Sequence, residues 1–376
     1  MSNKYTIPEG TRDLVLGECW IKKNLTNDLE HILDTWGYKE VVTPTTEFYQ
    51  TFNPGFQYLE DEDMYKFFDS NGRILVLRPD MTLPIARVVA TRFKDSPLPL
   101  RFRYTANIFH VNNKLSGRRN EFSDCGVEYI GAQGFDSDLE ILVTALESMK
   151  ILKNIHYKLE IGNVNIFKAA VKNINLNEEE IATLLSLMDK KSLKALDDFL
   201  AKTNLSEQHK QFFTKLPWLF GGVEVLEEVK TVAFNDEIKE EINYLEKLND
   251  AIIELGYKDL VTFDLGMVHR LSYYSGLIFR GYADGVGITI LTGGRYDKLI
   301  KIYGRDLPAV GFAIKLDALL EAIDEEIYPK LERLVIEYPT NKIVDALKLA
   351  KTKREEGLVV ELHQNNELTD IKERRD

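Results

Sequence analysis

Cysteine and histidine, the side chains that most often bind metals or act as nucleophiles, are few and scattered in this sequence. Its two cysteines, Cys19 and Cys125, have no metal-ligand spacing, and its six histidines are dispersed. A zinc site is therefore not expected, and isolated thiols of this kind are typical of a protein from a reducing cytosol. The other candidates for chemistry are carboxylates, tyrosines and arginines, which gather near glycines in a few short segments.

Four such segments follow one another along the chain. They are PEGTRDL (8–14), LRPDMTLPIAR (77–87), FRYTANIFHVNNKLSGRRNEFSDCGVEYIG (102–131) and DLGMVHRLSYYSGLIF (264–279), the last continued by TGGRYDKL (292–299) and PAVGFAIKLDAL (308–319). Taken singly, each has an ordinary explanation as a turn glycine, a half-buried strand aromatic or a strand end. The residues open to that explanation are Gly293, Gly294, Gly311, Tyr273, Tyr274 and Arg78.

Hydrophobic periodicity outlines the elements that must position these segments. An apolar helical face runs through Leu25, Leu29 and Leu33, and Gly37 follows at the expected helix end. Runs rich in β-branched and aromatic residues predict strands. These strands are expected over 39–42, 74–77, 100–110, 125–130, 259–265 and 276–291. Further helices are predicted over 136–153 and 311–325, with a turn at Gly293–Gly294 leading into a helix.

Residues 165–256 differ from the rest, because Leu, Lys and Glu dominate them at helical spacing. They predict a helical insertion. After Pro329, a strand (333–338), a helix (341–356) and a strand (357–362) predict a small β-α-β unit, and the polar tail 365–376 is expected to fray.

The sequence therefore predicts an α+β fold with a mostly antiparallel sheet and three parts. The expected parts are a core from 1–164 and 257–328, the insertion 165–256, and a short C-terminal α/β piece over 329–376.

The charge balance limits the classes of partner. Lys and Arg total 48 against 60 Asp and Glu, a net charge of -12, which disfavours a broad nucleic-acid surface. The first residues lack the basic-then-apolar order of a signal peptide, and no apolar run reaches the roughly 18 residues that cross a bilayer. We expect a cytoplasmic protein that binds neither tRNA nor membrane.

In their order and spacing, the four segments resemble histidyl-tRNA synthetase, a class II aminoacyl-tRNA synthetase. The resemblance extends from residue 8 to about residue 325, and its most specific parts are the Tyr273–Tyr274 pair and the GGRYD turn. It implies the class II antiparallel sheet flanked by helices. It also implies a dimer formed through the N-terminal motif, PEGTRDL with GYKEVVTPTTE (37–47).

The positions that bind ATP in that family have lost their charged side chains here. In the second motif, an arginine, a glutamate and a second arginine are replaced by His110, Asn112 and Asn113. An arginine of the histidine signature becomes His269, and the arginine of the third motif becomes Ala318. Because guanidinium groups stabilise the charge that develops on the α-phosphate, aminoacylation is predicted to be lost.

The amino-acid side of the site is kept. The resemblance implies that a histidine imidazole lies between Glu128 and Tyr274 and that Arg118 binds the carboxylate. The other residues implied for this pocket are Asp80, Thr82, Asp124, Tyr273, Arg295 and Tyr296. Asp80 is shorter than the family's glutamate and Asp124 replaces a glutamine, so contact of these two with histidine stays open. Three carboxylates near one ammonium predict a raised pKa for one of them in the empty site.

A chain that keeps the amino-acid pocket but has lost the charged residues of the nucleotide site resembles the regulatory subunits of ATP phosphoribosyltransferase. That resemblance implies a chain with no catalytic activity and no cofactor, acting at the first step of histidine biosynthesis. It implies a hetero-octamer with the short-form catalytic subunit, which needs this chain for activity and for feedback inhibition by histidine. Two alternatives stay open: an active histidyl-tRNA synthetase, and a scaffold subunit that binds no ligand.

Overall fold

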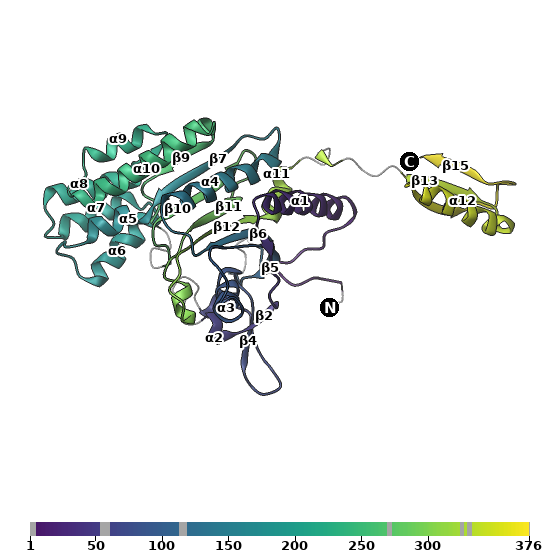
Figure 1. The fold of residues 1–376 in the computed structure, drawn as a ribbon, viewed down its shortest axis with the longest axis horizontal. Coiled ribbons are helices and arrows are strands. Elements are labelled where there is room, and N and C mark those ends of the chain that lie inside the picture. The colour runs from purple at the N-terminus through teal and green to yellow at the C-terminus, as the bar shows by residue number, and fades with distance from the viewer. Residues whose placement is uncertain are drawn as a thin grey trace. The chain divides into compact units, whose positions relative to one another are not determined.

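The computed structural model describes residues 5–52, 61–112, 119–268, 273–323, 327–328 and 333–375. The chain divides into two compact units, residues 1–323 and residues 324–376 (Figure 1). The expected treatment of 165–256 as a separate part stays a prediction. Within the described residues, none of the helices combines the length and the apolar character that crossing a membrane requires.

A nine-stranded sheet forms the centre of the first unit. Its strands are β1 (Lys39–Glu40), β5 (Leu100–Phe109), β6 (Glu121–Ile130), β7 (Tyr157–Asn163), β8 (Phe220–Gly221), β9 (Val261–Asp264), β10 (Leu277–Ala283), β11 (Leu291–Arg295) and β12 (Ala309–Lys315). They lie in the order β1-β5-β6-β12-β11-β10-β7-β9-β8. Among the pairings described within this sheet, only β1–β5 and β7–β9 are parallel. A separate antiparallel sheet has the order β2 (Thr46–Phe48), β4 (Ile74–Leu77) and β3 (Lys66–Phe68).

Helices pack against the large sheet (Figure 1). Outside the predicted insertion these are α1 (Leu16–Thr35), α3 (Thr82–Arg92), α4 (Phe135–Met149) and α11 (Leu316–Ala322). The short helix α2 (Tyr49–Phe52) packs instead against α3 and the small sheet. Helix α1 buries Leu25, Leu29 and Leu33, as its periodicity predicts, and contacts α4, α11, β5 and β6. Short 3-10 turns are η1 (Asp61–Asp63), η2 (Lys150–Leu152), η3 (Leu216–Trp218), η4 (Lys258–Leu260) and η5 (Ile300–Tyr303).

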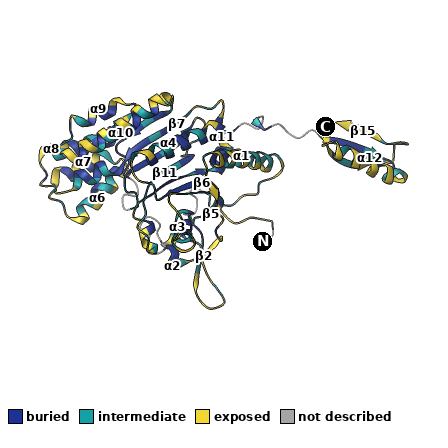
Figure 2. Ribbon diagram, in the orientation of Figure 1, coloured by how far each residue is buried: buried dark blue, intermediate teal, exposed yellow. Residues whose placement is uncertain are grey.

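The predicted insertion is helical, with only the two-residue strand β8 among its described elements. Its helices are α5 (Val164–Val171), α6 (Glu178–Asp189), α7 (Leu193–Lys202), α8 (Glu207–Lys215), α9 (Glu224–Lys230) and α10 (Asp236–Glu254). Leu184, Leu196 and Leu200, which share the predicted helical spacing, are buried. Figure 2 shows both buried and exposed stretches on the helices of this insertion. Helix α10 packs against α4, α5 and α9 and so joins the insertion to the sheet.

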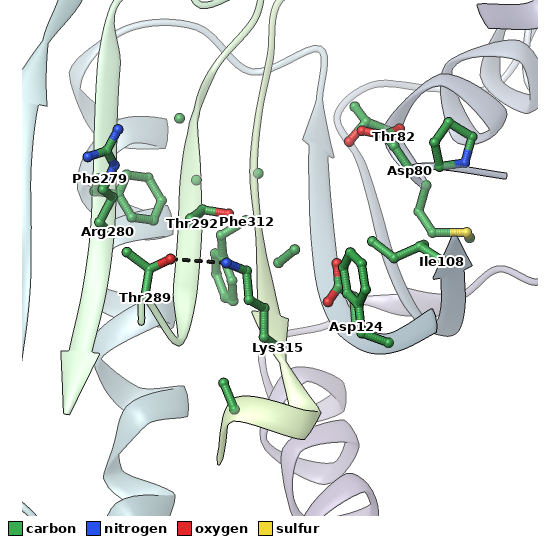
Figure 3. Close-up of a pocket in the computed structure, with 18 of the residues that line it drawn as sticks. Asp80, Thr82, Ile108, Asp124, Phe279, Arg280, Thr289, Thr292, Phe312 and Lys315 are labelled. Atoms are coloured by element: carbon green, nitrogen blue, oxygen red, sulfur yellow. Dashed lines mark hydrogen bonds between the residues drawn. The ribbon is translucent and has the colours of Figure 1, made fainter. Parts of the chain in front are cut away.

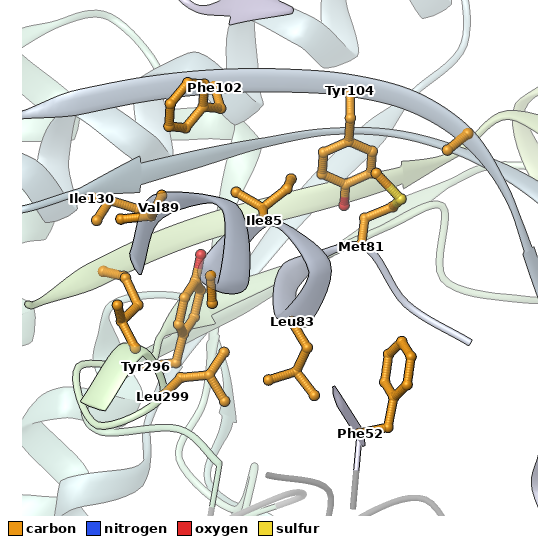
Figure 4. Close-up of a cluster of buried hydrophobic side chains, with 14 of the residues drawn as sticks. Phe52, Met81, Leu83, Ile85, Val89, Phe102, Tyr104, Ile130, Tyr296 and Leu299 are labelled. Atoms are coloured by element: carbon orange, nitrogen blue, oxygen red, sulfur yellow. The ribbon is translucent and has the colours of Figure 1, made fainter. Parts of the chain in front are cut away.

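One hydrophobic cluster fixes helix α3 against the sheet (Figure 4). Leu83, Ile85 and Val89 of α3 are fully buried beside Phe102 of β5 and Ile130 of β6. Full burial of a side chain of this size stabilises the fold by about 1.5–3 kcal/mol. The first turn of α3 is therefore held in a defined position on this face of the sheet.

The second unit contains β13 (Arg333–Tyr338), η7 (Thr340–Lys342), α12 (Ile343–Glu355), β14 (Val359–Gln364) and β15 (Lys372–Arg375). Strands β13 and β14 are parallel, which confirms the predicted β-α-β unit. The expectation that the tail frays is wrong for β15, because it pairs antiparallel with β13.

Two local predictions around the glycine-rich segments are wrong. Gly293 and Gly294 lie inside β11, and the predicted 276–291 strand is β10 followed by a turn that leads into β11. The predicted helix 311–325 begins only at Leu316, after strand β12. Strand β12 is buried on both faces, and such an apolar run has no periodicity that separates a strand from a helix.

Candidate functional site

A cavity of about 780 Å³ lies on the face of the sheet that α3 also covers (Figure 3). Seven of the residues predicted for the amino-acid pocket line it. These are Asp80, Thr82, Asp124, Glu128, Tyr273, Tyr274 and Tyr296. The structure therefore brings together residues from α3, β6, the segment before β10 and the segment after β11.

Strand alternation places the two central carboxylates side by side. Asp124 and Glu128 are four residues apart on β6, so both side chains point to the same face of the sheet. Their cross-strand partners on β12 are Lys315 and Gly311, respectively. Both carboxylates are buried, with exposed fractions of 7% and 2%.

Burial raises the pKa of both carboxyl groups. It raises the pKa of Asp124 to about 7, opposed by the charge of Lys315 and reinforced by Asp80 and Asp317. Burial also raises the pKa of Glu128 well above its usual value, with hydrogen bonding to Thr82 opposing the shift and Asp80 adding to it. The predicted upward shift is confirmed in direction, but burial contributes more than repulsion.

Several polar atoms at this cavity have no hydrogen-bond partner within the described part of the chain. They are Oδ1 of Asp124, Oε2 of Glu128 and the hydroxyl of Tyr296, all buried. Leaving one such atom unsatisfied costs about 1–3 kcal/mol. Three of them around one cavity indicate a polar ligand that donates hydrogen bonds.

The start of α3 supplies the next two polar groups. Oδ1 of Asp80 accepts a hydrogen bond from the backbone N–H of Leu83 at 3.1 Å, which fixes this carboxylate at the first turn of the helix. Thr82, the first residue of α3, lies beside it on the cavity (Figure 3). The charge of Asp80 raises the pKa of both Asp124 and Glu128, so Asp80 acts on each of the two β6 carboxylates across the cavity.

Tyrosine rings form the apolar part of the lining. Tyr273 stacks on Tyr296 with ring centroids 5.5 Å apart, and Tyr274 meets Tyr273 edge-on at 4.8 Å. The Nζ of Lys168, on α5, donates to the Tyr274 carbonyl at 2.5 Å. A Cβ on Gly294 would lie 2.7 Å from the Tyr274 ring, so a glycine is needed where this ring crosses β11. The glycine is thus a close-approach position, not a turn.

Arg295 does not line the cavity, contrary to what the resemblance implies. It follows Gly294 on β11, so its side chain points to the opposite face of the sheet. There it is buried in an ion pair with Asp138 of α4, with Nη2 and Oδ1 2.6 Å apart. Asp138 also accepts from the Tyr244 hydroxyl of α10 at 2.6 Å. Arg295 therefore joins the sheet, α4 and the insertion.

Three predicted residues, Arg118, Asn113 and His269, lie outside the described residues. Conversely, sequence reasoning missed several polar residues that line the cavity. They are Arg119, Arg280, Thr289, Thr292, Lys315, Asp317 and Glu321. Alternation along a strand could have placed some of these on one face, but only the register between strands brings them together.

Comparison with known proteins identifies the family. A family model described as histidyl-tRNA synthetase matches residues 10–319. An ATP phosphoribosyltransferase regulatory subunit of Clostridium novyi is 39% identical over 98% of this chain and 88% of its own length. One from Clostridium botulinum is 40% identical over 86% of this chain and 77% of its own length. The chain belongs to the family of ATP phosphoribosyltransferase regulatory subunits.

Solved structures agree with this regulatory-subunit family. A Bacillus halodurans structure described as an ATP phosphoribosyltransferase regulatory subunit/histidyl-tRNA synthetase matches with a TM-score of 0.87 and 31% identity, covering 98% of this chain and 94% of that one. Histidyl-tRNA synthetase from Nostoc matches with a TM-score of 0.78 at 19% identity, over 96% of this chain and 86% of that one, which shows the fold alone. The predicted class II synthetase-like fold and the non-catalytic, regulatory assignment are confirmed.

In this regulatory subunit, the described positions that replace ATP-binding residues are used within the fold. The Nε2 of His110 lies 2.7 Å from the Pro79 carbonyl oxygen. The side-chain amide of Asn112 donates to the Arg119 carbonyl at 2.7 Å. Ala318 is buried and has no polar side-chain group. The Nε2 of His110 and the amide of Asn112 are thus engaged within the fold, and Ala318 offers a phosphate no polar group.

Arg119, a cation that also lines the cavity, is neutralised by neighbouring carboxylates. Nη1 of Arg119 lies 3.2 Å from Oδ1 of Asp317, and Nη2 lies 2.8 Å from Oε1 of Glu321. Asp317 is also 3.4 Å from the Nζ of Lys22 and accepts from the backbone N–H of Ser123 at 2.8 Å. The charge of Arg119 thus stabilises the junction of α11 with β6.

Proposed function

We propose that this chain is the histidine-sensing subunit of ATP phosphoribosyltransferase. It binds free histidine in the carboxylate-lined cavity and passes feedback inhibition to a short-form catalytic subunit, which needs this chain for activity. One observation carries the proposal. Buried, unpartnered oxygens of Asp124 and Glu128 face a tyrosine-lined cavity, while the adjoining His110 and Asn112 are hydrogen-bonded within the fold.

Histidine matches the donors and acceptors of this cavity. Its ammonium group is a triple donor and suits the cluster of Asp80, Thr82 and Asp124. Its imidazole then reaches Glu128 and Tyr274, where a ring N–H donates to the unpartnered Glu128 oxygen. An apolar amino acid makes the ammonium contacts but leaves the Glu128 oxygen unsatisfied, which costs about 1–3 kcal/mol. The contact with Glu128 therefore distinguishes histidine from apolar amino acids.

The proposed assembly is a hetero-octamer of this chain with the catalytic subunit. In it, this chain forms a dimer through residues 8–14 and 37–47, and the complex is cytoplasmic. Histidine then inhibits by favouring one of two arrangements of the complex. A coupling free energy of about 1–3 kcal/mol between the two sites is typical of such control.

Calorimetry with free histidine tests the binding step. The informative variant is Glu128→Gln, and Glu121→Gln on the same strand is the matched control, because Glu121 does not line the cavity. We expect the wild type and Glu121→Gln to bind equally and Glu128→Gln to bind at least about tenfold more weakly. Absence of binding at millimolar histidine, with the catalytic subunit present, would contradict the proposal.

The competing synthetase activity has its own assay. Histidine-dependent exchange of pyrophosphate into ATP reports adenylate formation. We expect no exchange above a protein-free blank, because Asn112 and Ala318 carry no charge and the Nε2 of His110 is engaged with the Pro79 carbonyl, so the guanidinium contacts to the α-phosphate are lost. Exchange that depends on histidine and is lost in Glu128→Gln would instead assign an active ligase.

A further inference from the structure

The strand register places a lysine directly beside Asp124, one of the unpartnered acceptors of the cavity. Lys315, the last residue of β12, is the cross-strand partner of Asp124 on β6. Residues paired in this way point to the same face with Cβ atoms about 4.5–5.5 Å apart. Both line the cavity, so a cation and an anion stand on neighbouring strands of its wall. In Figure 3 the Lys315 ammonium is turned toward Thr289, and the Asp124 carboxylate lies on the other side of the lysine side chain.

Neighbouring contacts hold Lys315 in this position. Its Nζ donates to Oγ1 of Thr289 at 3.0 Å, the contact drawn in Figure 3. Its backbone N–H donates to the Ile290 carbonyl at 2.8 Å, which joins the end of β12 to the segment between β10 and β11. Lys315 also opposes the burial shift in the Asp124 pKa, so its charge reaches the carboxylate.

The other described cations on the cavity wall have different partners. Arg119 is paired with Asp317 and Glu321. Arg280 lies opposite Glu160 on β7, and its charge acts on the pKa of that carboxylate. Lys315 is thus the described cation adjacent to Asp124. Arg118, which the resemblance implies for the ligand carboxylate, lies outside the described residues.

We infer that Lys315 binds the carboxylate of the amino-acid ligand, and that Lys315 and Asp124 together recognise its zwitterionic head group. This inference rests on the proposed function and adds the source of selectivity for a free amino acid. In an α-amino acid, one carbon carries both charged groups, so a cation and an anion side by side on the wall match it. An amine without a carboxylate leaves Lys315 without this contact.

Calorimetry with histidine, histidine methyl ester and histamine tests the inference. The wild type is expected to bind histidine about 10- to 100-fold more tightly than the ester or histamine, the range of one charge-assisted contact. In Lys315→Met this preference falls to within about threefold, chiefly through weaker histidine binding. In Lys315→Arg, which keeps the cation, it is largely retained. Thermal unfolding checks that each variant is folded.

Each outcome bears on the inference separately from the proposed function. If wild type binds histidine and Lys315→Met keeps the full preference, the proposed function stands and the carboxylate belongs to another group, such as Arg118. If wild type binds histidine and its methyl ester equally, the inference is overturned without any variant, so a misfolded Lys315→Met does not leave it untested. If wild type binds no histidine, both proposals fail.

Discussion

Glu128 on β6 and Gly311 on β12 are cross-strand partners, and the glutamate carboxylate occupies the space that a side chain at residue 311 would need. A Cβ on Gly311 would overlap Oε2 of Glu128 and the Val127 carbonyl oxygen, and would lie 3.1 Å from the Tyr296 hydroxyl. The absence of a side chain at residue 311 therefore decides where the proposed imidazole acceptor lies.

Gly311→Ala is predicted to abolish histidine binding without unfolding the chain. The added methyl group collides with buried backbone and with Glu128, which must move from its position at the cavity. We expect a loss of stability of about 1–3 kcal/mol from overpacking, measured by urea unfolding, and loss of the calorimetric signal for histidine.

Gly17→Ala is the control for this change, because a Cβ there meets no atom within 4 Å. It should leave histidine binding unchanged. A Gly311→Ala protein that bound histidine as tightly as the wild type would show that Glu128 does not need its present position.

The pH dependence of stability tests the burial of Asp124. Its pKa is about 7 in the folded chain, against 3.8 for an ordinary aspartate. Between these values the folded state holds a proton that the unfolded state has released. Its contribution to the free energy of unfolding is therefore present at low pH and is lost as the pH rises through about 7.

Asp124→Asn should remove this part of the pH dependence of the free energy of unfolding. The contribution of Glu128 to that pH dependence is the same in both proteins. Urea unfolding at intervals from pH 4.5 to 8 measures the difference between the two. A difference that stays constant over this range would mean that Asp124 ionises normally. If the difference between the two unfolding free energies changes up to about pH 7, the desolvated position of Asp124 on the cavity wall is supported.

Arg295 is predicted to matter for stability more than for ligand binding. It is buried with Asp138 on the face opposite the cavity, and removing one partner of a buried ion pair costs about 3–5 kcal/mol. We expect Arg295→Met to lower the urea midpoint strongly while the folded fraction still binds histidine. Asp138→Leu added to it should recover part of the loss.

The exposed pair Lys301–Asp306 provides the comparison for this ion pair. Lys301→Met should leave the midpoint almost unchanged, because exposed ion pairs contribute little. A selective loss of histidine affinity in Arg295→Met, with unchanged stability, would contradict this prediction and show that Arg295 takes part in ligand binding.

The sequence was a reliable guide wherever a motif kept both its residues and its local geometry. Asp124 and Glu128 lie within one strand, so their common face follows from their spacing alone. Arg295 shows the limit of motif transfer. It is one residue from Gly294 and adjoins the pocket in sequence, yet alternation along β11 directs it to the opposite face.

Lys315 was missed for a different reason. Its proximity to Asp124 depends on the pairing of β12 with β6, which no local pattern encodes, and the apolar residues before it predict a helix as well as a strand. The strand β15 was missed similarly, because a charged edge strand has no apolar signal and is identified only by its partner β13.

Histidine inhibition of the reconstituted complex is the most direct test of the sensing role. Catalytic subunit assembled with wild-type chain, and separately with the Glu128→Gln variant, is assayed across a histidine titration. We expect equal activity without histidine, and inhibition in the wild-type complex that is lost or shifted at least about tenfold in the variant complex. Inhibition at the same histidine concentrations in both complexes would contradict a histidine sensor in this cavity.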